Sequence, residues 1–149
     1  MTDIRDRIVD FRRVKAADLL PHPLNFRRHP PEQVSAMRAV LERIGYAGAC
    51  LAYQEPDGSL RLIDGHLRRE LGPDHLHPTL ITDLKPEEAE AVLATYDRIG
   101  ALAEQDAAAL DLLLTSINAN MDLGALEADP RLEALLGELR PPPLLGDPD

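Results

Sequence analysis

Apolar residues recur at the three- and four-residue spacing of an α-helix in four parts of the chain. The first part follows Pro30 and Pro31, which are pre-organised for a first helical turn, and ends at Gly45, which fits a helix C-terminus. The other three lie beyond Pro86. The apolar positions are Val34, Met37, Val40, Leu41 and Ile44; then Ala89, Val92, Leu93, Tyr96, Ile99 and Leu102; then Leu110, Leu113, Leu114 and Ile117; and finally Leu132, Leu135, Leu136 and Leu139. This spacing predicts four amphipathic helices.

Short apolar runs bounded by turn residues predict strands. Four such runs lie at 8–14, 49–53, 60–63 and 77–82. The residues between the second and third runs, Gln-Glu-Pro-Asp-Gly-Ser, have strong turn chemistry and predict a hairpin. Prolines in segment 16–28 favour an extended connection after the first strand.

The helical and extended patterns together predict an α+β fold. A short helix is expected at His66–Leu71, because Gly72 and Pro73 stop it. Thr82 or Asp83 is expected to cap the helix that begins near Pro86.

Charge is distributed unevenly along the chain. The net charge is −10, which argues against tight, nonspecific binding to a phosphate backbone. Basic and acidic residues nearly balance up to Leu80, whereas acidic residues dominate beyond it. Any contact with an anion is therefore expected from the first half.

Cysteine and apolar content exclude several classes of protein. Cys50 is the only cysteine, so neither an intrachain disulfide nor a cysteine-based zinc cluster is possible. We expect Cys50 to be a small, buried apolar residue. The chain shows no signal-peptide pattern and no apolar run long enough for a bilayer, so a cytoplasmic location without membrane contact is expected. It also lacks the glycine-lysine pattern of a P-loop.

Five histidines raise the question of a metal site. His75 and His77 alternate and would share one face of a strand, but with no cysteine partner the ligand set would need carboxylates. A surface or turn role is therefore expected for both. His66 is the exception, since a histidine at the start of a helix can donate to a phosphate or shuttle a proton.

The segment from Leu62 to Glu70 carries the most specific chemistry. A strand ends, Gly65 permits a tight turn, and a helix begins with Arg68 and Arg69 in its first turns. Unpaired N–H groups at a helix start attract an anion, and arginine adds donors suited to phosphate oxygens. Adjacent helical residues diverge by about 100°, so only one arginine is expected to face the anion directly.

An ordinary structural role for the same segment remains open. Strand–glycine–helix junctions are common in folds that combine strands and helices. In that case Arg68 and Arg69 would be solvated charges paired with Glu70 or Asp74.

Three segments in order resemble the ParB/sulfiredoxin superfamily. The first box, residues 20–28 (Leu-Pro-His-Pro-Leu-Asn-Phe-Arg-Arg), resembles the family's "NPxxxR" box. The second box, residues 62–71, stands where partition proteins have a Gly-Glu-Arg-Arg box. The third box, residues 93–99 (Leu-Ala-Thr-Tyr-Asp-Arg-Ile), is similar to a later helical box. The resemblance implies a small mixed β-sheet with flanking helices, and it runs from about Val14 to Asp106.

The resemblance also implies a ligand and a set of site residues. Partition proteins cradle the triphosphate of CTP with the glycine-arginine box and use an acidic residue of the third box near Mg²⁺. By position, the implied phosphate contacts are Gly65, His66, Arg68 and Arg69, with Arg27 and Arg28 closing over the ligand. Asp97 would lie on the metal side, His66 and Asp97 are the candidate catalytic residues, and Asn25, Asp64 and Arg98 are expected nearby. CTP or ATP with Mg²⁺ is the expected ligand.

Two residues of the second box differ from the family pattern and change the expected phosphate contacts. His66 replaces the glutamate of the second box and Leu67 replaces its first arginine, so one phosphate contact is lost. Sulfiredoxin chemistry needs a cysteine where this chain has His66, and it is excluded.

Within that superfamily, residues 64–68 (Asp-Gly-His-Leu-Arg), 82–89 (Thr-Asp-Leu-Lys-Pro-Glu-Glu-Ala) and 96–99 (Tyr-Asp-Arg-Ile) resemble ParB-like domains of phages and mobile elements. Such domains often accompany DNA methyltransferases. The expected organisation is a lead-in at 1–13, a ParB-like domain at 14–106, a helical extension at 107–140 and a proline-rich tail at 141–149. The expected function is nucleotide or nucleic-acid phosphate binding in a DNA transaction, with a methyltransferase or DNA as possible partners and the extension as a possible dimerisation element. The alternatives are a metal-dependent nucleotide hydrolase, small-molecule kinase or nuclease of this fold, and a non-catalytic protein-interaction module.

Overall fold

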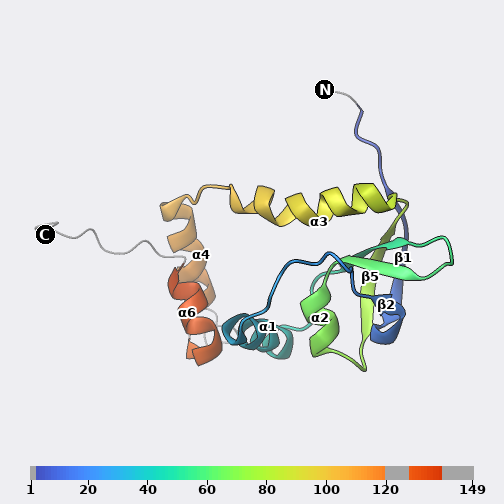
Figure 1. Cartoon of the computed structure of the whole chain (residues 1–149). Coiled ribbons are helices and arrows are strands. Elements are labelled where there is room, and N and C mark those ends of the chain that lie inside the picture. The colour runs from blue at the N-terminus through green and yellow to red at the C-terminus, as the bar shows by residue number, and fades with distance from the viewer. Residues whose placement is uncertain (1–2, 120–127, 139–149) are drawn as a thin grey trace, which may run out of the picture. The chain divides into compact units, whose positions relative to one another are not determined.

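The computed structural model describes residues 3–119 and 128–138 (Figure 1). Its contacts divide the chain into two compact units. The first contains residues up to 30 and residues 46–103, and the second contains residues 31–45 and those from 104 onward. The sequence-based boundaries at 14–106 and 107–140 stay predictions, and the tail at 141–149 lies outside the described residues.

A five-stranded mixed sheet forms the centre of the first unit, as the α+β prediction requires. The strand order is β1-β5-β3-β4-β2, with β1–β5 and β3–β4 antiparallel and β3–β5 and β2–β4 parallel. The strands are β1 (Ile8–Lys15), β2 (Leu19–Leu20), β3 (Cys50–Gln54), β4 (Leu60–Asp64) and β5 (Leu76–Thr82). The four predicted strands are confirmed. The short strand β2, which follows the 3₁₀ turn Ala16–Asp18, was not predicted, because two residues carry no periodicity.

Both faces of the sheet are apolar around its centre. Alternate residues of a strand point to opposite faces, so Ala52 and Tyr53 join different clusters. One cluster is Val14, Leu19, Cys50, Ala52, Leu60, Leu62 and Ile81. The other contains Tyr53 and Ile63 and is covered by Ala89 and Leu93 of α3 (Pro86–Ala101). The predicted amphipathic helix is therefore confirmed, and it fixes the third box against the sheet.

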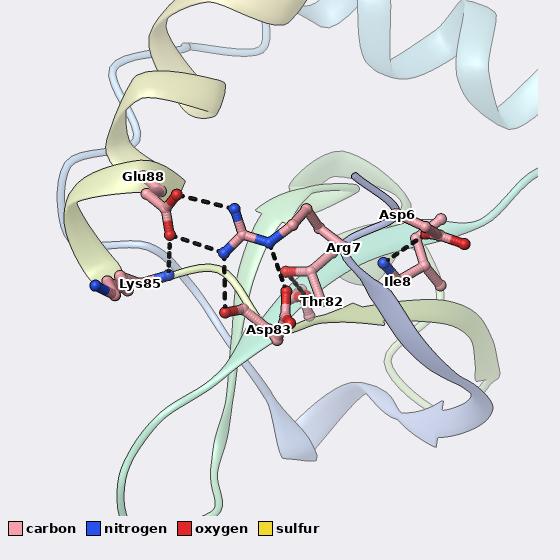
Figure 2. A network of polar contacts seen from close by, with 8 residues as sticks. Asp6, Arg7, Ile8, Thr82, Asp83, Lys85 and Glu88 are labelled. Atoms are coloured by element: carbon pink, nitrogen blue, oxygen red, sulfur yellow. Dashed lines mark hydrogen bonds and ion pairs between the residues drawn. The ribbon is translucent and has the colours of Figure 1, made fainter. Parts of the chain in front are cut away.

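Arg7 ties the segment before β1 to the start of α3 (Figure 2). Its guanidinium donates to the Asp83 carboxylate at 2.7 Å and to both Glu88 oxygens at 2.8 and 2.9 Å. These hydrogen bonds lower the pKa of Glu88 to about 2. Glu88 also accepts the Lys85 backbone N–H at 3.0 Å, so Lys85 is the residue before the first turn. The expectation that Thr82 or Asp83 caps α3 was wrong, because Pro86 and Glu88 define the start at Lys85 instead.

The described part of the second unit, residues 31–45, 104–119 and 128–138, is mainly helical. Its helices are α1 (Pro31–Arg43), α4 (Ala107–Ala119) and α6 (Pro130–Glu138), and the predicted Gly45 terminus of α1 is confirmed by its positive φ of 106°. Ala36 and Ala39 of α1 pack against Leu132 of α6. The buried Asp129 carboxylate before α6 joins these helices, because it pairs with Arg43 at 2.7 Å and Arg131 at 3.0 Å.

The turn from β4 into α2 (His66–Leu71) depends on Gly65. Its φ is 108°, and a Cβ built there would lie 2.5 Å from the Cys50 sulfur. Gly58 has a similar φ of 89°, but its nearest neighbour is the Gln54 side-chain amide at 4.0 Å. A side chain at either glycine would meet the strain of a positive φ, but only at Gly65 would it also lack space. Comparing the two positions therefore separates the two effects.

We expect Gly65→Ala to lower the free energy of unfolding by about 2–4 kcal/mol, because overpacking adds about 1–3 kcal/mol to a backbone strain of about 1 kcal/mol. Gly58→Ala, the matched control, should lose only about 1 kcal/mol. Urea unfolding of both variants measures the difference. Equal losses would contradict the close contact with Cys50.

Candidate functional site

Residues from all three boxes line one cleft beside α3. The cleft has a volume of about 250 Å³ and lies on the face of the sheet that α3 covers. Arg27 comes from the first box, Asp64 from the second, and Tyr96 and Asp97 from the third. The remaining lining residues are the apolar Leu51, Ile63, Val92 and Leu93. The cleft thus combines an apolar floor with one cationic and two anionic side chains.

Arg27 connects the first and third boxes. Its Nη2 lies 2.9 Å from an Asp97 carboxylate oxygen and donates to the Leu93 carbonyl at 3.3 Å. The Asp97 side chain is 63% exposed, so solvent and ligands can reach it. The Arg27 backbone N–H in turn donates to the Asn25 side-chain oxygen at 3.4 Å, which gives Asn25 a role in the local turn.

The predicted arginines of the second box point to different parts of the fold. Arg68 Nη2 donates to the Ala49 carbonyl at 3.2 Å and lies 3.6 Å from the Asp64 carboxylate. Arg69 Nε donates to the Ala16 carbonyl at 2.9 Å. The two side chains therefore diverge, as expected for neighbours on a helix. Only Arg68 is paired with a residue that lines the cleft.

His66 is buried and neutral. It is 6% exposed, and burial lowers its pKa to about 4. Its Nε2 accepts the backbone N–H of His22 at 3.0 Å, which places the ring proton on Nδ1. His22 is also buried, burial lowers its pKa, and its Nδ1 accepts the Leu24 backbone N–H at 3.0 Å. The His66 imidazole therefore links the second box to the His22 backbone of the first box, whereas the His22 imidazole bonds within the first box.

His77 is fully buried, so the expected surface or turn role was wrong for this residue. The register of β5 places it opposite Val14, inside the sheet. Its Nε2 lies 2.7 Å from the Gly72 carbonyl, which can only accept, so Nε2 carries the proton and Nδ1 accepts from the Tyr46 hydroxyl at 3.0 Å. Tyr46 also contacts the Cys50 sulfur at 3.2 Å. Cys50 is buried, as predicted.

The remaining predicted site residues lie at the surface. Arg28 and Arg98 are exposed. No group of three or more histidine, cysteine or carboxylate side chains forms a metal cage within residues 3–119 and 128–138. Asp64 and Asp97 are the carboxylates that line the cleft, and the catalytic and metal roles of His66 and Asp97 stay predictions.

The sequence does not mark Leu51 or Tyr96 as lining a cleft. Leu51 is predicted only as part of a strand, and Tyr96 as part of an apolar helical stripe and of the third box. His22 and Tyr46 do not line the cleft, and their hydrogen bonds join residues 44 and 31 positions away. Only the place of His22 in the first box pointed to either residue in the sequence.

Comparisons with known proteins support the fold. No protein-family model matches the sequence, and no curated protein is found to match it. Among solved structures, the chain is similar to the crystal structure of the C-terminally truncated chromosome-partitioning protein ParB from Caulobacter crescentus, complexed with CTP-γ-S. The TM-score is 0.56 at 15% sequence identity, and the match covers 87% of this chain and 86% of that chain. The two proteins share a fold. Within the described residues, no helix combines the length and apolar character needed to cross a bilayer.

The neutral state of His66 predicts a pH-dependent stability. Its folded pKa of about 4 lies below the ordinary value of 6.5, so between these values the unfolded chain binds a proton that the folded chain does not. The free energy of unfolding should therefore fall as the pH is lowered, with about 2 kcal/mol lost through His66 between about pH 7.5 and about pH 5. Urea unfolding across this range measures it.

The matched variants are His66→Gln, which removes the titrating group, and His75→Gln at an exposed position. We expect the first to flatten the pH dependence and the second to leave it intact. An unchanged slope in His66→Gln would show that His66 is not the group responsible.

Proposed function

We propose that this chain binds a nucleoside triphosphate, with CTP as the first candidate, in the cleft between α3 and the sheet. The observation that carries the proposal is that Arg27, Asp64 and Asp97, one from each box, line the same cleft. The shared fold with a partition protein crystallised with CTP-γ-S supports it. Apolar residues such as Leu51 and Val92 offer a surface for a ring, and the charged residues lie at the same cleft.

Arg27 and Arg68 are the proposed phosphate ligands. Both guanidiniums are bound to carboxylates, Arg27 to Asp97 and Arg68 to Asp64, and these pairs fix their positions near the cleft. A phosphate oxygen can replace a carboxylate oxygen at a guanidinium with similar hydrogen-bond geometry. On ligand binding, Arg27 would exchange Asp97 for a phosphate, which frees the Asp97 carboxylate. Arg69 is held by Ala16, so its proposed role is to anchor α2.

The carboxylates of the cleft fit Mg²⁺ held together with phosphates. Mg²⁺ is commonly bound by one or two carboxylates plus phosphates and water, rather than by a complete protein cage. Asp64 and Asp97 supply two carboxylates, and no larger acidic cluster competes with them within residues 3–119 and 128–138. When bound, the ion would neutralise phosphate charge. The proposed part of Asp97 is to accept the ion after its release from Arg27.

We place this activity in a DNA transaction of the kind served by ParB-like domains of phages and mobile elements. The support is the resemblance of the three boxes and the shared fold. The near balance of charge up to Leu80 is compatible with a nucleic-acid partner, whereas the acidic second half would repel one.

Thermal unfolding with CTP, ATP and GTP, each with and without Mg²⁺, tests the proposal. A ligand present at 100 times its Kd adds about 2.7 kcal/mol to the stability of the folded state, which raises the midpoint. We expect the largest rise with CTP and Mg²⁺. No rise with any nucleotide at millimolar concentration would refute nucleotide binding.

Variants locate the site. Arg27→Ala should abolish most of the rise, because it removes a phosphate ligand, and Asp97→Asn should remove its dependence on Mg²⁺. Arg13→Ala, at an exposed arginine of β1, is the matched control and should respond like the unaltered chain. If Arg27→Ala also responds like the unaltered chain, the nucleotide binds elsewhere.

A further inference from the structure

The turn that follows β2 attaches the first box to β4 and to α2. The Pro21 carbonyl accepts from Arg61 of β4 at 3.0 Å, and the next backbone N–H, that of His22, donates to His66 at 3.0 Å. His22 and His66 are 5% and 6% exposed, so water cannot easily replace this second bond. His66 is thus the buried side-chain acceptor at this attachment.

The turn continues from His22 to Arg27 through short hydrogen bonds. The His22 carbonyl accepts the Asn25 N–H at 3.1 Å, and the His22 ring accepts the Leu24 N–H at 3.0 Å. The Asn25 side chain then accepts the Arg27 N–H at 3.4 Å. Each step spans two or three residues, which leaves the backbone little freedom between His22 and Arg27.

We propose that His66 is a positioning residue for Arg27: its Nε2 holds the His22 N–H and thereby fixes the turn that presents the Arg27 guanidinium to the cleft. This inference rests in part on the proposed function, because it gives Arg27 a ligand to bind. It assigns His66 a role different from direct phosphate contact or proton transfer. Loss of the acceptor would leave a buried N–H unpaired and release the turn.

The two roles of His66 use different ring nitrogens, so two amide substitutions separate them. Glutamine places its side-chain oxygen where Nε2 lies, whereas asparagine reaches only to the position of Nδ1. A positioning role through Nε2 predicts that His66→Gln keeps nucleotide binding and that His66→Asn and His66→Ala weaken it by about tenfold or more. Binding retained by His66→Asn and lost by His66→Gln would overturn the proposal in favour of a donor at Nδ1. Binding retained by all three variants would also overturn it.

A double-variant cycle adds a readout that general destabilisation would not move. If His66 acts through Arg27, then His66→Ala should weaken CTP binding in the unaltered chain but not further in Arg27→Ala. Independent losses that add in the double variant would contradict the proposal. The Kd values are measured at a temperature where circular dichroism shows every variant folded.

Limited trypsin digestion tests the positioning step without any nucleotide. Trypsin cleaves after Arg27 and Arg28, so release of the turn should increase cleavage there several-fold in His66→Ala and His66→Asn, but not in His66→Gln. Equal cleavage in all chains would overturn the proposal even if CTP binds. If CTP does not bind the unaltered chain, the proposed function fails, while this digestion still decides whether His66 holds the Arg27 segment.

Discussion

The close contact between Gly65 and Cys50 determines how the second box is presented. Gly65 adopts a φ of 108°, and it has no Cβ, which would lie 2.5 Å from the Cys50 sulfur. For these two reasons β4 can turn directly into α2 against the neighbouring strand. One residue before the turn, Asp64 reaches the cleft, and one residue after it, His66 is buried. Asp64 and His66, on the two sides of Gly65, therefore lie in different environments.

Buried imidazoles form several of the hydrogen bonds that connect distant segments of this unit. The chain has few aromatic residues, and its core consists mainly of small and aliphatic side chains. Buried polar groups are tolerated only when they are hydrogen-bonded, and His22, His66 and His77 each have such a partner. His66 joins two boxes, whereas His77 joins Tyr46 to the carbonyl of Gly72. Three of the five histidines, namely His22, His66 and His77, thus act as hydrogen-bonding links within the fold.

Local patterns predicted the elements well, because periodicity and turn chemistry are local properties. The hairpin of β3 and β4, the short helix α2 and the amphipathic α3 all follow from residues a few positions apart. The wrong predictions concern the cap of α3 and the burial of His77, which depend on residues distant in the sequence. The capping of α3 at Lys85 accompanies a contact of Glu88 with Arg7, and the burial of His77 depends on its pairing with β1.

Some features of the cleft follow from residues close in the sequence, and others from residues far apart in it. The glycine-arginine turn was visible in the sequence, and so was the divergence of its two arginines. The pairing of Arg27 with Asp97 joins residues 70 positions apart, and no local pattern contains it. Only the resemblance of three ordered boxes placed them near one ligand. The common lining of the cleft by Arg27, Asp64 and Asp97 is therefore information that the fold adds.

Charge balance in the cleft bears on the kind of ligand that the proposed function requires. Arg27 is already paired with Asp97, and Arg68 with Asp64, so a lone anion would have to displace a carboxylate and leave it without a cation. An anion that arrives with a divalent cation satisfies both groups, because the phosphate takes the arginine and the cation takes the carboxylate. A metal-bound triphosphate therefore suits this cleft better than a bare phosphate or a nucleic-acid backbone. Under the proposed function, the same exchange predicts stronger binding of the triphosphate with Mg²⁺ than without it.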